Sequence, residues 1–180
     1  ELIALAKSRP GKLNYASSGN GTPYHMAGEL FKHLAGVSIT HVPYKGSSGA
    51  RTDIIGGQVD MMFDAVTTMA AMAKEGKVRG LATTGRTRSS PDLPIVAESV
   101  PKYEATIWLG LMAPKGTPPA VLSKLNEAVR KIVNSPEVKE AWSKQGAVPM
   151  SMTVGEFEKY LNEDIAKWGD LVRASGMKAD

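Results

Sequence analysis

The sequence contains no cysteine, and its 180 residues include only three histidines. The lack of cysteine excludes a disulfide, a zinc–thiolate centre and a cysteine nucleophile, and it fits an oxidising compartment where stray thiols are a hazard. No apolar run reaches the ~18 residues that a membrane-spanning helix needs. We expect no signal peptide within this sequence, because its first residues already have helical periodicity. We therefore expect the chain to begin inside a helix, as a piece of a longer protein would.

The pattern of charge and of reactive side chains excludes further classes of function. The net charge is +4, but the basic residues are spread out and lack interleaved aromatics, so we expect no nucleic-acid partner. No histidine has a carboxylate at a diagnostic spacing, and no group of His, Asp or Glu has the spacing of metal ligands. The serine and glycine residues from Ser17 to Gly21 match neither a nucleophile elbow nor a P-loop. The sequence therefore predicts no catalytic residue, no metal and no cofactor.

The most informative stretch, from Tyr15 to His25, predicts the end of a strand, a loop and the start of a helix. Thr22 suits the N-cap of that helix and Pro23 suits its first position. A junction of this kind directs free backbone N–H groups and the positive end of a helix at one spot, where hydroxyl groups add donors. The stretch indicates either an anion site or an ordinary strand-to-helix turn that needs glycine for its geometry.

Strands and helices alternate over residues 1–105. We expect strands at residues 13–16, 38–42, 58–63 and 78–84, and helices at residues 1–7, 23–34, 50–55 and 67–74. Ser47 or Ser48 is the expected N-cap of the third helix. Short links between alternating elements predict an α/β fold with a mostly parallel sheet.

Residues 106–180 are mainly helical. We expect strands at residues 105–113 and 148–149, and helices at residues 118–133, 136–145 and 153–174. Thr117 is the expected N-cap of the first of these helices, and Thr153 with Glu156 predicts a capping box on the last. An apolar stripe on the first is expected to face a core and consists of Leu122, Leu125, Val129 and Ile132. Little strand is available to cover these helices, so the sheet that they need is expected upstream of Glu1.

Four motifs in register carry a resemblance to one family. They are Tyr15-Ala-Ser-Ser-Gly-Asn-Gly-Thr22, His41-Val-Pro-Tyr-Lys-Gly46, Gly56-Gly-Gln-Val-Asp-Met-Met-Phe-Asp64 and Leu111-Met-Ala-Pro-Lys-Gly-Thr-Pro118. Over its whole length the sequence is similar to the Bug (TctC) family, the extracytoplasmic solute receptors of tripartite tricarboxylate transporters in proteobacteria. Members of that family are longer, with a signal peptide and further first-lobe residues, so this chain resembles them from late in the first lobe onward.

The resemblance implies a type II periplasmic-binding-protein fold, in which two α/β lobes hold a ligand between them. Residues 1–10 would end a first-lobe helix, residues 11–105 would form a complete second lobe, and residues 106–180 would be a hinge strand and the C-terminal helices that return to the first lobe. One ligand loop, residues 17–22, would be present, and the facing loop would lie outside the sequence. Without its first-lobe sheet, the chain could form a dimer or exchange elements with another copy.

The same resemblance implies a periplasmic receptor that binds without chemistry. Its ligand would be a small carboxylate, namely a dicarboxylate, a tricarboxylate, an acidic amino acid or an aromatic acid, and its partners would be the membrane components of the transporter. Two alternatives stay open. One is an α/β enzyme that uses the serine–glycine loop as an oxyanion or phosphate site, and the other is a sensory domain of the same fold.

The predicted ligand-binding residues follow from the loop and from the strand ends beside it. The loop supplies Ser17, Ser18, Gly19, Gly21 and Thr22, of which Thr22 can also cap the helix. His25, in the first helical turn and expected to be half-exposed, is either a donor to the ligand or inert. Tyr44 either lines the pocket or belongs to a solvated turn. Asp64 either contacts the ligand or caps the next helix.

Overall fold

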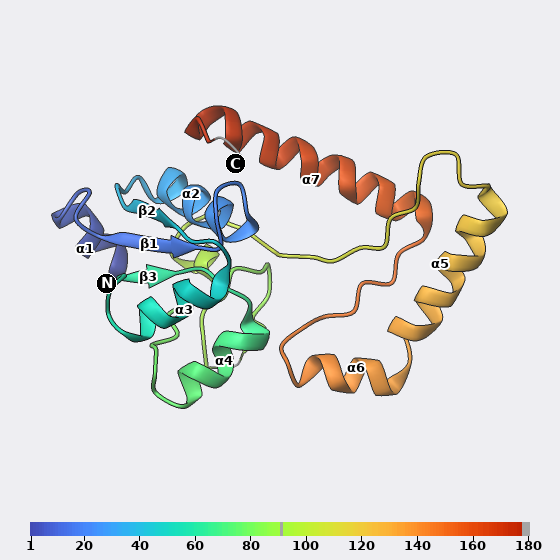
Figure 1. Cartoon of the computed structure of the whole chain (residues 1–180), viewed down its shortest axis with the longest axis horizontal. Coiled ribbons are helices and arrows are strands. Elements are labelled where there is room, and N and C mark those ends of the chain that lie inside the picture. Colours follow the sequence, from blue (N-terminus) through green and yellow to red (C-terminus); the bar gives the residue numbers. More distant parts are fainter. Residues whose placement is uncertain (91, 178–180) are drawn as a thin grey trace. The chain divides into compact units, whose positions relative to one another are not determined.

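The computed structural model describes residues 1–90 and 92–177 (Figure 1). The chain divides into two compact units. The sheet unit comprises residues 1–107 together with the chain from residue 169 onward, and the helical unit comprises residues 108–168.

The sheet unit is built on three parallel strands. They are β1 (Asn14–Ser17), β2 (Thr40–Pro43) and β3 (Met61–Met62), in the order β2-β1-β3. In the register, Tyr15 lies beside His41 of β2 and beside Met61 of β3. The helices of this unit are α1 (Leu2–Ser8), α2 (Pro23–Ala35), α3 (Ser47–Ile55) and α4 (Val66–Lys74), with a short 3₁₀ helix at Val96–Glu98. The alternation of parallel strands and helices confirms the expected α/β class.

Neighbouring residues of β1 face opposite sides of the sheet, and each side has its own helix. Ala16 packs with Ala50 of α3 and with Val59. Tyr15 points the other way, against α2, where a Cβ added at Gly28 would lie 2.2 Å from its ring. Since side chains alternate along a strand, this pairing places α2 and α3 on opposite faces of β1 (Figure 1). The face on which a β1 side chain lies therefore decides which helix it meets.

A second apolar cluster lies on the α2 side. The ring of Phe31 contacts the rings of Phe63 and Tyr103, with centroids 6.0 and 6.3 Å apart. Tyr103 also donates a hydrogen bond to the carbonyl of Ala27, at 3.1 Å. This contact joins the segment before the helical unit to α2, within the sheet unit.

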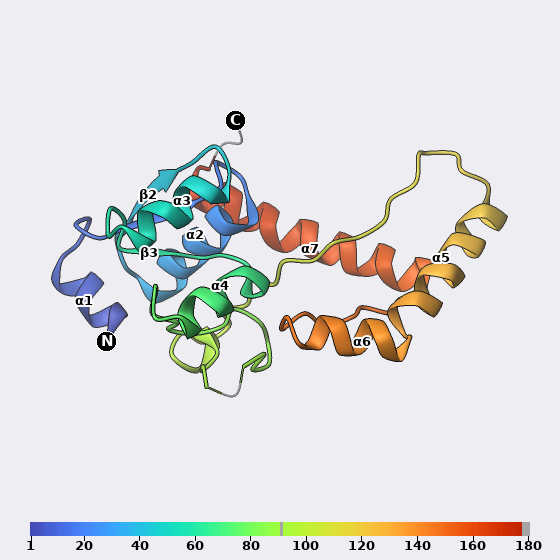
Figure 2. The same cartoon turned by 60° about the horizontal axis from the view of Figure 1, so that its bottom comes forward.

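The helical unit contains α5 (Pro119–Val133), α6 (Pro136–Ser143) and most of α7 (Val154–Ser175). Trp108 packs edge-on against Phe157 and Tyr160 and donates from Nε1 to Asp164, at 2.9 Å. The predicted capping box is confirmed, because the Thr153 amide donates to Glu156 Oε2 at 2.8 Å and the Glu156 amide donates to Thr153 Oγ1 at 3.2 Å. Figure 2 shows residues 108–117 as an irregular trace that leads to α5.

The apolar stripe of α5 does not face a core among the described residues. Leu125 is 44% exposed and Ile132 is 58% exposed. Val133 is the one buried hydrophobic residue recorded between residues 108 and 168. The stripe prediction was wrong for this chain because periodicity identifies an apolar face but does not supply the element that covers it.

Several of the predicted strands are missing from the structure or shorter than predicted. Residues 105–113 and 148–149 form no strand in the described chain, and residues 78–84 form only an isolated bridge between Thr83 and Ile95. The strand expected at residues 58–63 is reduced to Met61–Met62. A strand needs a hydrogen-bonded neighbour, and Leu109, which is 97% exposed, has none to pack beside.

Two predicted N-caps were also wrong. Gly46, not Ser47 or Ser48, is the N-cap of α3, and Pro118, not Thr117, is the N-cap of α5. Gly46 has a φ of 107°, in the region that favours glycine. Thr117 instead donates to the carbonyl of Pro114, at 2.8 Å.

A candidate anion site at the carboxyl end of the sheet

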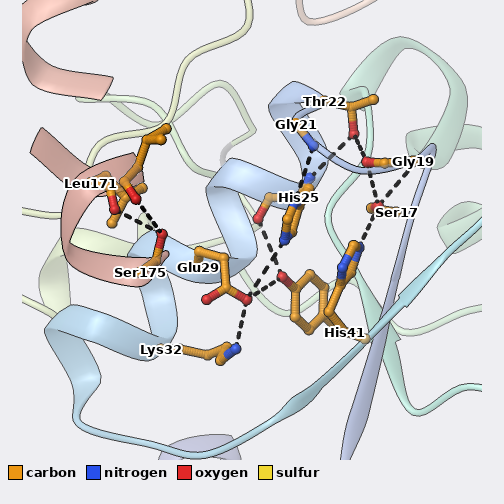
Figure 3. A network of polar contacts seen from close by, with 12 residues as sticks. Ser17, Gly19, Gly21, Thr22, His25, Glu29, Lys32, His41, Leu171 and Ser175 are labelled. Carbon is orange, nitrogen blue, oxygen red and sulfur yellow. Dashed lines mark hydrogen bonds and ion pairs between the residues drawn. The ribbon is translucent and has the colours of Figure 1, made fainter. Parts of the chain in front are cut away.

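Ser17 ends β1 and anchors the loop that follows it (Figure 3). Its side chain is fully buried. Its Oγ lies 2.7 Å from His41 Nε2, and it also exchanges hydrogen bonds with the backbone N–H and carbonyl of Gly19, both at 3.1 Å. The hydroxyl therefore holds the loop to β2.

Thr22 closes the other end of the loop, as predicted. Its hydroxyl donates to the carbonyl of Gly19 at 2.7 Å and accepts from the amide of His25 at 3.5 Å. This is the N-cap arrangement expected for the start of α2. Glycine is required at position 19, where φ is 135° and a Cβ would lie 3.2 Å from the carbonyl oxygen of Tyr44.

His25 is buried rather than half-exposed, which corrects the prediction. Only 6% of the residue is exposed, and its Nδ1 accepts a hydrogen bond from the amide of Gly21, at 3.0 Å. Its ring stacks on the ring of His41, with centroids 3.8 Å apart and planes 6° apart. Position in the first helical turn did not reveal this burial, because the covering ring comes from β2.

A polar cluster continues from the two rings along α2. Glu29 Oε1 accepts from Tyr15 Oη at 2.7 Å and from Lys32 Nζ at 2.6 Å, and it lies 3.9 Å from His25 Nε2 (Figure 3). Burial opposes ionisation of Glu29, but the hydrogen bonds from Lys32 and Tyr15 lower its pKa overall. Burial, together with the hydrogen bond to Glu29, raises the pKa of Tyr15.

The surroundings of His41 disfavour its protonated form. Burial and then the neighbouring His25 lower the pKa of His41 to about 4, although Glu29 opposes this shift. Its partnership with Ser17, 24 residues away, was missed, and the only signal for it was the parallel pairing of the two strands.

Asp64 follows β3 and is already paired within the chain. Its side chain is fully buried and accepts from Arg51 Nε at 2.5 Å, from Arg51 Nη2 at 3.0 Å and from the amide of Ala65 at 2.8 Å. The N-cap of α4 is Ala65, so the capping alternative for Asp64 was wrong. Arg51 was not among the predicted site residues because it lies 13 residues before its partner.

Tyr44 meets the loop through its backbone. Its amide donates to the carbonyl of Ser17, and the amide of Gly46 donates to the carbonyl of Ser18, both at 3.1 Å. The Tyr44 side chain points into the cluster beneath α3, where its hydroxyl donates to Asp53 at 2.5 Å. The structure therefore brings Ser17–Thr22, His25 and the Tyr44 backbone together.

Three helices begin at this edge of the sheet, because α2, α3 and α4 follow the carboxyl ends of β1, β2 and β3. Neither α3 nor α4 has a side-chain N-cap hydrogen bond, and none of the three has an acidic residue in its first turn. The first amides of a helix lack intrahelical partners, and they carry partial positive charge. Ser18, half-buried in the loop, has a hydroxyl that makes no hydrogen bond within the described residues. This edge can therefore offer donors to an anion.

The described residues contain neither a metal-binding cluster nor a membrane-spanning helix. No group of three or more His, Cys, Asp or Glu side chains there is arranged to hold a metal ion. No helix in residues 1–90 or 92–177 has the length and apolar character needed to cross a membrane.

Comparison with known proteins gives a consistent result. The family described as tripartite tricarboxylate transporter family receptor matches residues 1–177. A protein from the tcbD–tcbE intergenic region of Pseudomonas sp. (strain P51) is 40% identical over 96% of this chain and 52% of its own length. BugT of Bordetella pertussis is 34% identical over 98% of this chain and 55% of its own length. The chain thus spans about half the length of these relatives.

Solved structures agree with the sequences. R. palustris Rpa4515 with adipate has a TM-score of 0.89 and 33% identity, covering 99% of this chain and 61% of that protein. MatC from Rhodopseudomonas palustris with bound malate has a TM-score of 0.81 and 29% identity, covering 95% and 60%. The periplasmic binding protein BugD has a TM-score of 0.84 and 30% identity. The resemblance inferred from the four motifs is confirmed, and the chain belongs to the receptor family of the tripartite tricarboxylate transporters.

Proposed function

We propose that this chain carries one wall of the ligand site of an extracytoplasmic receptor that captures a small carboxylate for a tripartite tricarboxylate transporter. The observation that carries the proposal is the carboxyl end of the sheet, where the loop of residues 17–22 and the starts of three helices come together. Similar structures contain adipate and malate, which are both dicarboxylates. A negatively charged ligand matches the electrostatic character of this edge.

The polar groups of the loop divide into a scaffold and a ligand-facing part. The side chains of Ser17 and Thr22 are engaged inside the loop, so they set its shape. The Ser18 hydroxyl and the first amides of α3 and α4 are the groups proposed to donate to the carboxylate. Since both oxygens of Asp64 already accept hydrogen bonds from Arg51, we assign Asp64 to support of the site rather than to direct contact.

We further propose that binding proceeds without chemistry. The 2.7 Å contact between Ser17 Oγ and His41 Nε2 has the geometry of a nucleophile and its base, which is the one observation that favours the enzyme alternative. Against it, the Ser17 side chain is fully buried, so a substrate carbonyl cannot reach Oγ in this arrangement. Membership of a receptor family supports binding as the function.

The division into lobes, the cellular location and the partners of the protein are also proposals. We propose that residues 11–105 form the second lobe of the receptor and that residues 106–180 return to the first lobe, which would cover the exposed faces of α5 and α6. The location is proposed to be the periplasm, and the partners are the membrane components of the transporter. A dimer or an exchange of elements is proposed for the isolated chain, because Leu125 and Ile132 are exposed on it.

Calorimetric titration of the full-length protein with dicarboxylates, tricarboxylates, acidic amino acids and aromatic acids tests the function. We expect at least one of these to bind reversibly, and we expect Ser18→Ala to weaken that binding by about tenfold to about a hundredfold, since a hydrogen bond to a charged group contributes ~1.5–3 kcal/mol. Ser123→Ala, an exposed change on α5, is the control and should leave the affinity unchanged. Turnover of an acyl or phosphate ester would contradict the proposal.

The same titration on the 180-residue chain tests the division of the site between two lobes. If the facing loop supplies half of the donors, this chain alone should bind the same carboxylate only weakly. Affinity equal to that of the full-length protein would show that the second loop is not needed.

A further inference from the structure

The stacked rings of His25 and His41 lie directly behind the loop of residues 17–22, and each ring holds a different part of it (Figure 3). His25 Nδ1 accepts from the amide of Gly21, at 3.0 Å. His41 Nε2 lies 2.7 Å from the hydroxyl of Ser17, which in turn bonds both backbone groups of Gly19. The two histidines thus reach both halves of the loop.

The contact between His25 and Gly21 fixes the protonation state of one ring nitrogen. A backbone amide can only donate, so Nδ1 of His25 must present its lone pair and cannot carry a proton. A second proton on this ring has no place except Nδ1, because the neutral ring already carries its proton on Nε2. Protonation of His25 therefore requires the Gly21 amide to move away.

A positive charge on both rings at once is unfavourable. The rings are 3.8 Å apart and nearly parallel, so two imidazolium ions would repel each other at short distance. Among the described residues, the charged and titratable groups near them include Glu29 and Lys32 of α2 and Tyr15 of β1. Glu29, the one carboxylate among these three, already accepts from Tyr15 and Lys32.

We infer that His25 and His41 are positioning residues of the carboxylate site: the stacked pair holds the loop of residues 17–22 in its binding shape only while His25 is neutral, so that carboxylate binding weakens on acidification. This inference rests on the proposed function for its ligand. It predicts the opposite sign from a direct contact, because a protonated histidine that touched the carboxylate would strengthen binding at acidic pH.

Adipate binding to the full-length protein, measured by calorimetry between about pH 8 and about pH 5 and corrected for protonation of adipate itself, is the first test. We expect the affinity to fall at least tenfold over this interval. An affinity that rises or stays constant as the pH falls would overturn the inference.

Two variants of His25 distinguish a positioning role from a general loss of folding. His25→Asn keeps a side-chain oxygen close to the place of Nδ1 and cannot be protonated, so its affinity at about pH 8 should stay within about threefold of the parent and its pH dependence should be reduced. His25→Leu removes the acceptor and should lose at least tenfold in affinity while retaining a cooperative unfolding transition. Equal affinity of His25→Leu and His25→Asn would contradict the role of the Gly21 contact.

A ligand-free measurement keeps this inference distinct from the proposed function. In an NMR titration of the same protein, the Gly21 amide should shift and lose its protection from hydrogen exchange with the same midpoint as the His25 ring signals. If His25 titrates while the Gly21 amide does not respond, the positioning role is excluded whatever the ligand. If the two titrate together but no carboxylate binds, the proposed function fails and the control of the loop by His25 stands.

Discussion

Arg51 donates two hydrogen bonds to Asp64, whose side chain is fully buried at the end of β3. The pair links α3 to the start of α4, at the edge of the sheet where the ligand site is proposed. Arg88 and Glu98 make the same two-bond arrangement, at 2.9 and 2.8 Å, but in an exposed position. The chain therefore contains a buried ion pair and an exposed one of matching geometry.

Asp64→Ala should lower the free energy of unfolding by about 2–4 kcal/mol, because it leaves the Arg51 guanidinium without its partner in a mostly buried place. Glu98→Ala, the matched change in the exposed pair, should lower it by less than about 1 kcal/mol. Urea unfolding followed by circular dichroism measures both. Equal losses for the two variants would show that burial does not decide the contribution of Asp64.

Gly28→Ala should destabilise the protein by about 1–3 kcal/mol, although alanine favours helix more than glycine does. The added Cβ would lie 2.2 Å from the Tyr15 ring, and that ring is held in place by its hydrogen bond to Glu29. Gly169→Ala in α7 is the control, since its Cβ would approach only the flexible end of Arg173. A gain in thermal stability for Gly28→Ala would mean that α2 can move away from β1 at little cost.

Thr22→Ala should lower the free energy of unfolding by about 1 kcal/mol, because the N-cap of α2 loses its hydroxyl. Thr22→Ser retains the hydroxyl and should recover most of this loss. Chemical denaturation of the three proteins tests the pair of expectations, and a serine variant as unstable as the alanine variant would assign the effect to the lost methyl group instead.

The stability of the protein should depend on pH through His41. Its pKa in the folded state is about 4, below the value of about 6.5 in an unfolded chain, so between these values the unfolded state binds the proton first. The free energy of unfolding should therefore fall as the pH falls from about 6.5 to about 4, by on the order of 1–2 kcal/mol after allowance for partial exposure of the ring.

His41→Gln isolates this contribution, because glutamine can reach Ser17 and does not titrate. The difference in unfolding free energy between parent and variant, measured by urea denaturation at several pH values, should change over that interval and be constant above about pH 7. A difference that is independent of pH would mean that His41 titrates equally in both states.

Local patterns predicted the helices of this chain well. Thr22 with Pro23 located the start of α2, and Thr153 with Glu156 located the start of α7, since the partners in such caps lie within three residues of each other. The loop of residues 17–22 was located for the same reason, because glycine, serine and threonine at a strand end determine a local geometry. The residues predicted to contact a ligand stay predictions.

The sequence by itself thus determined the helices, the loop and the family, because these depend on short-range periodicity, on capping and on motifs. Tertiary structure alone decided what each polar side chain meets. It buried His25 under His41, paired Asp64 with Arg51, and left the predicted strand at residues 105–113 without a neighbour. These outcomes depend on segments far apart in the chain, and no local pattern specifies which segment will arrive to cover, pair with or extend another.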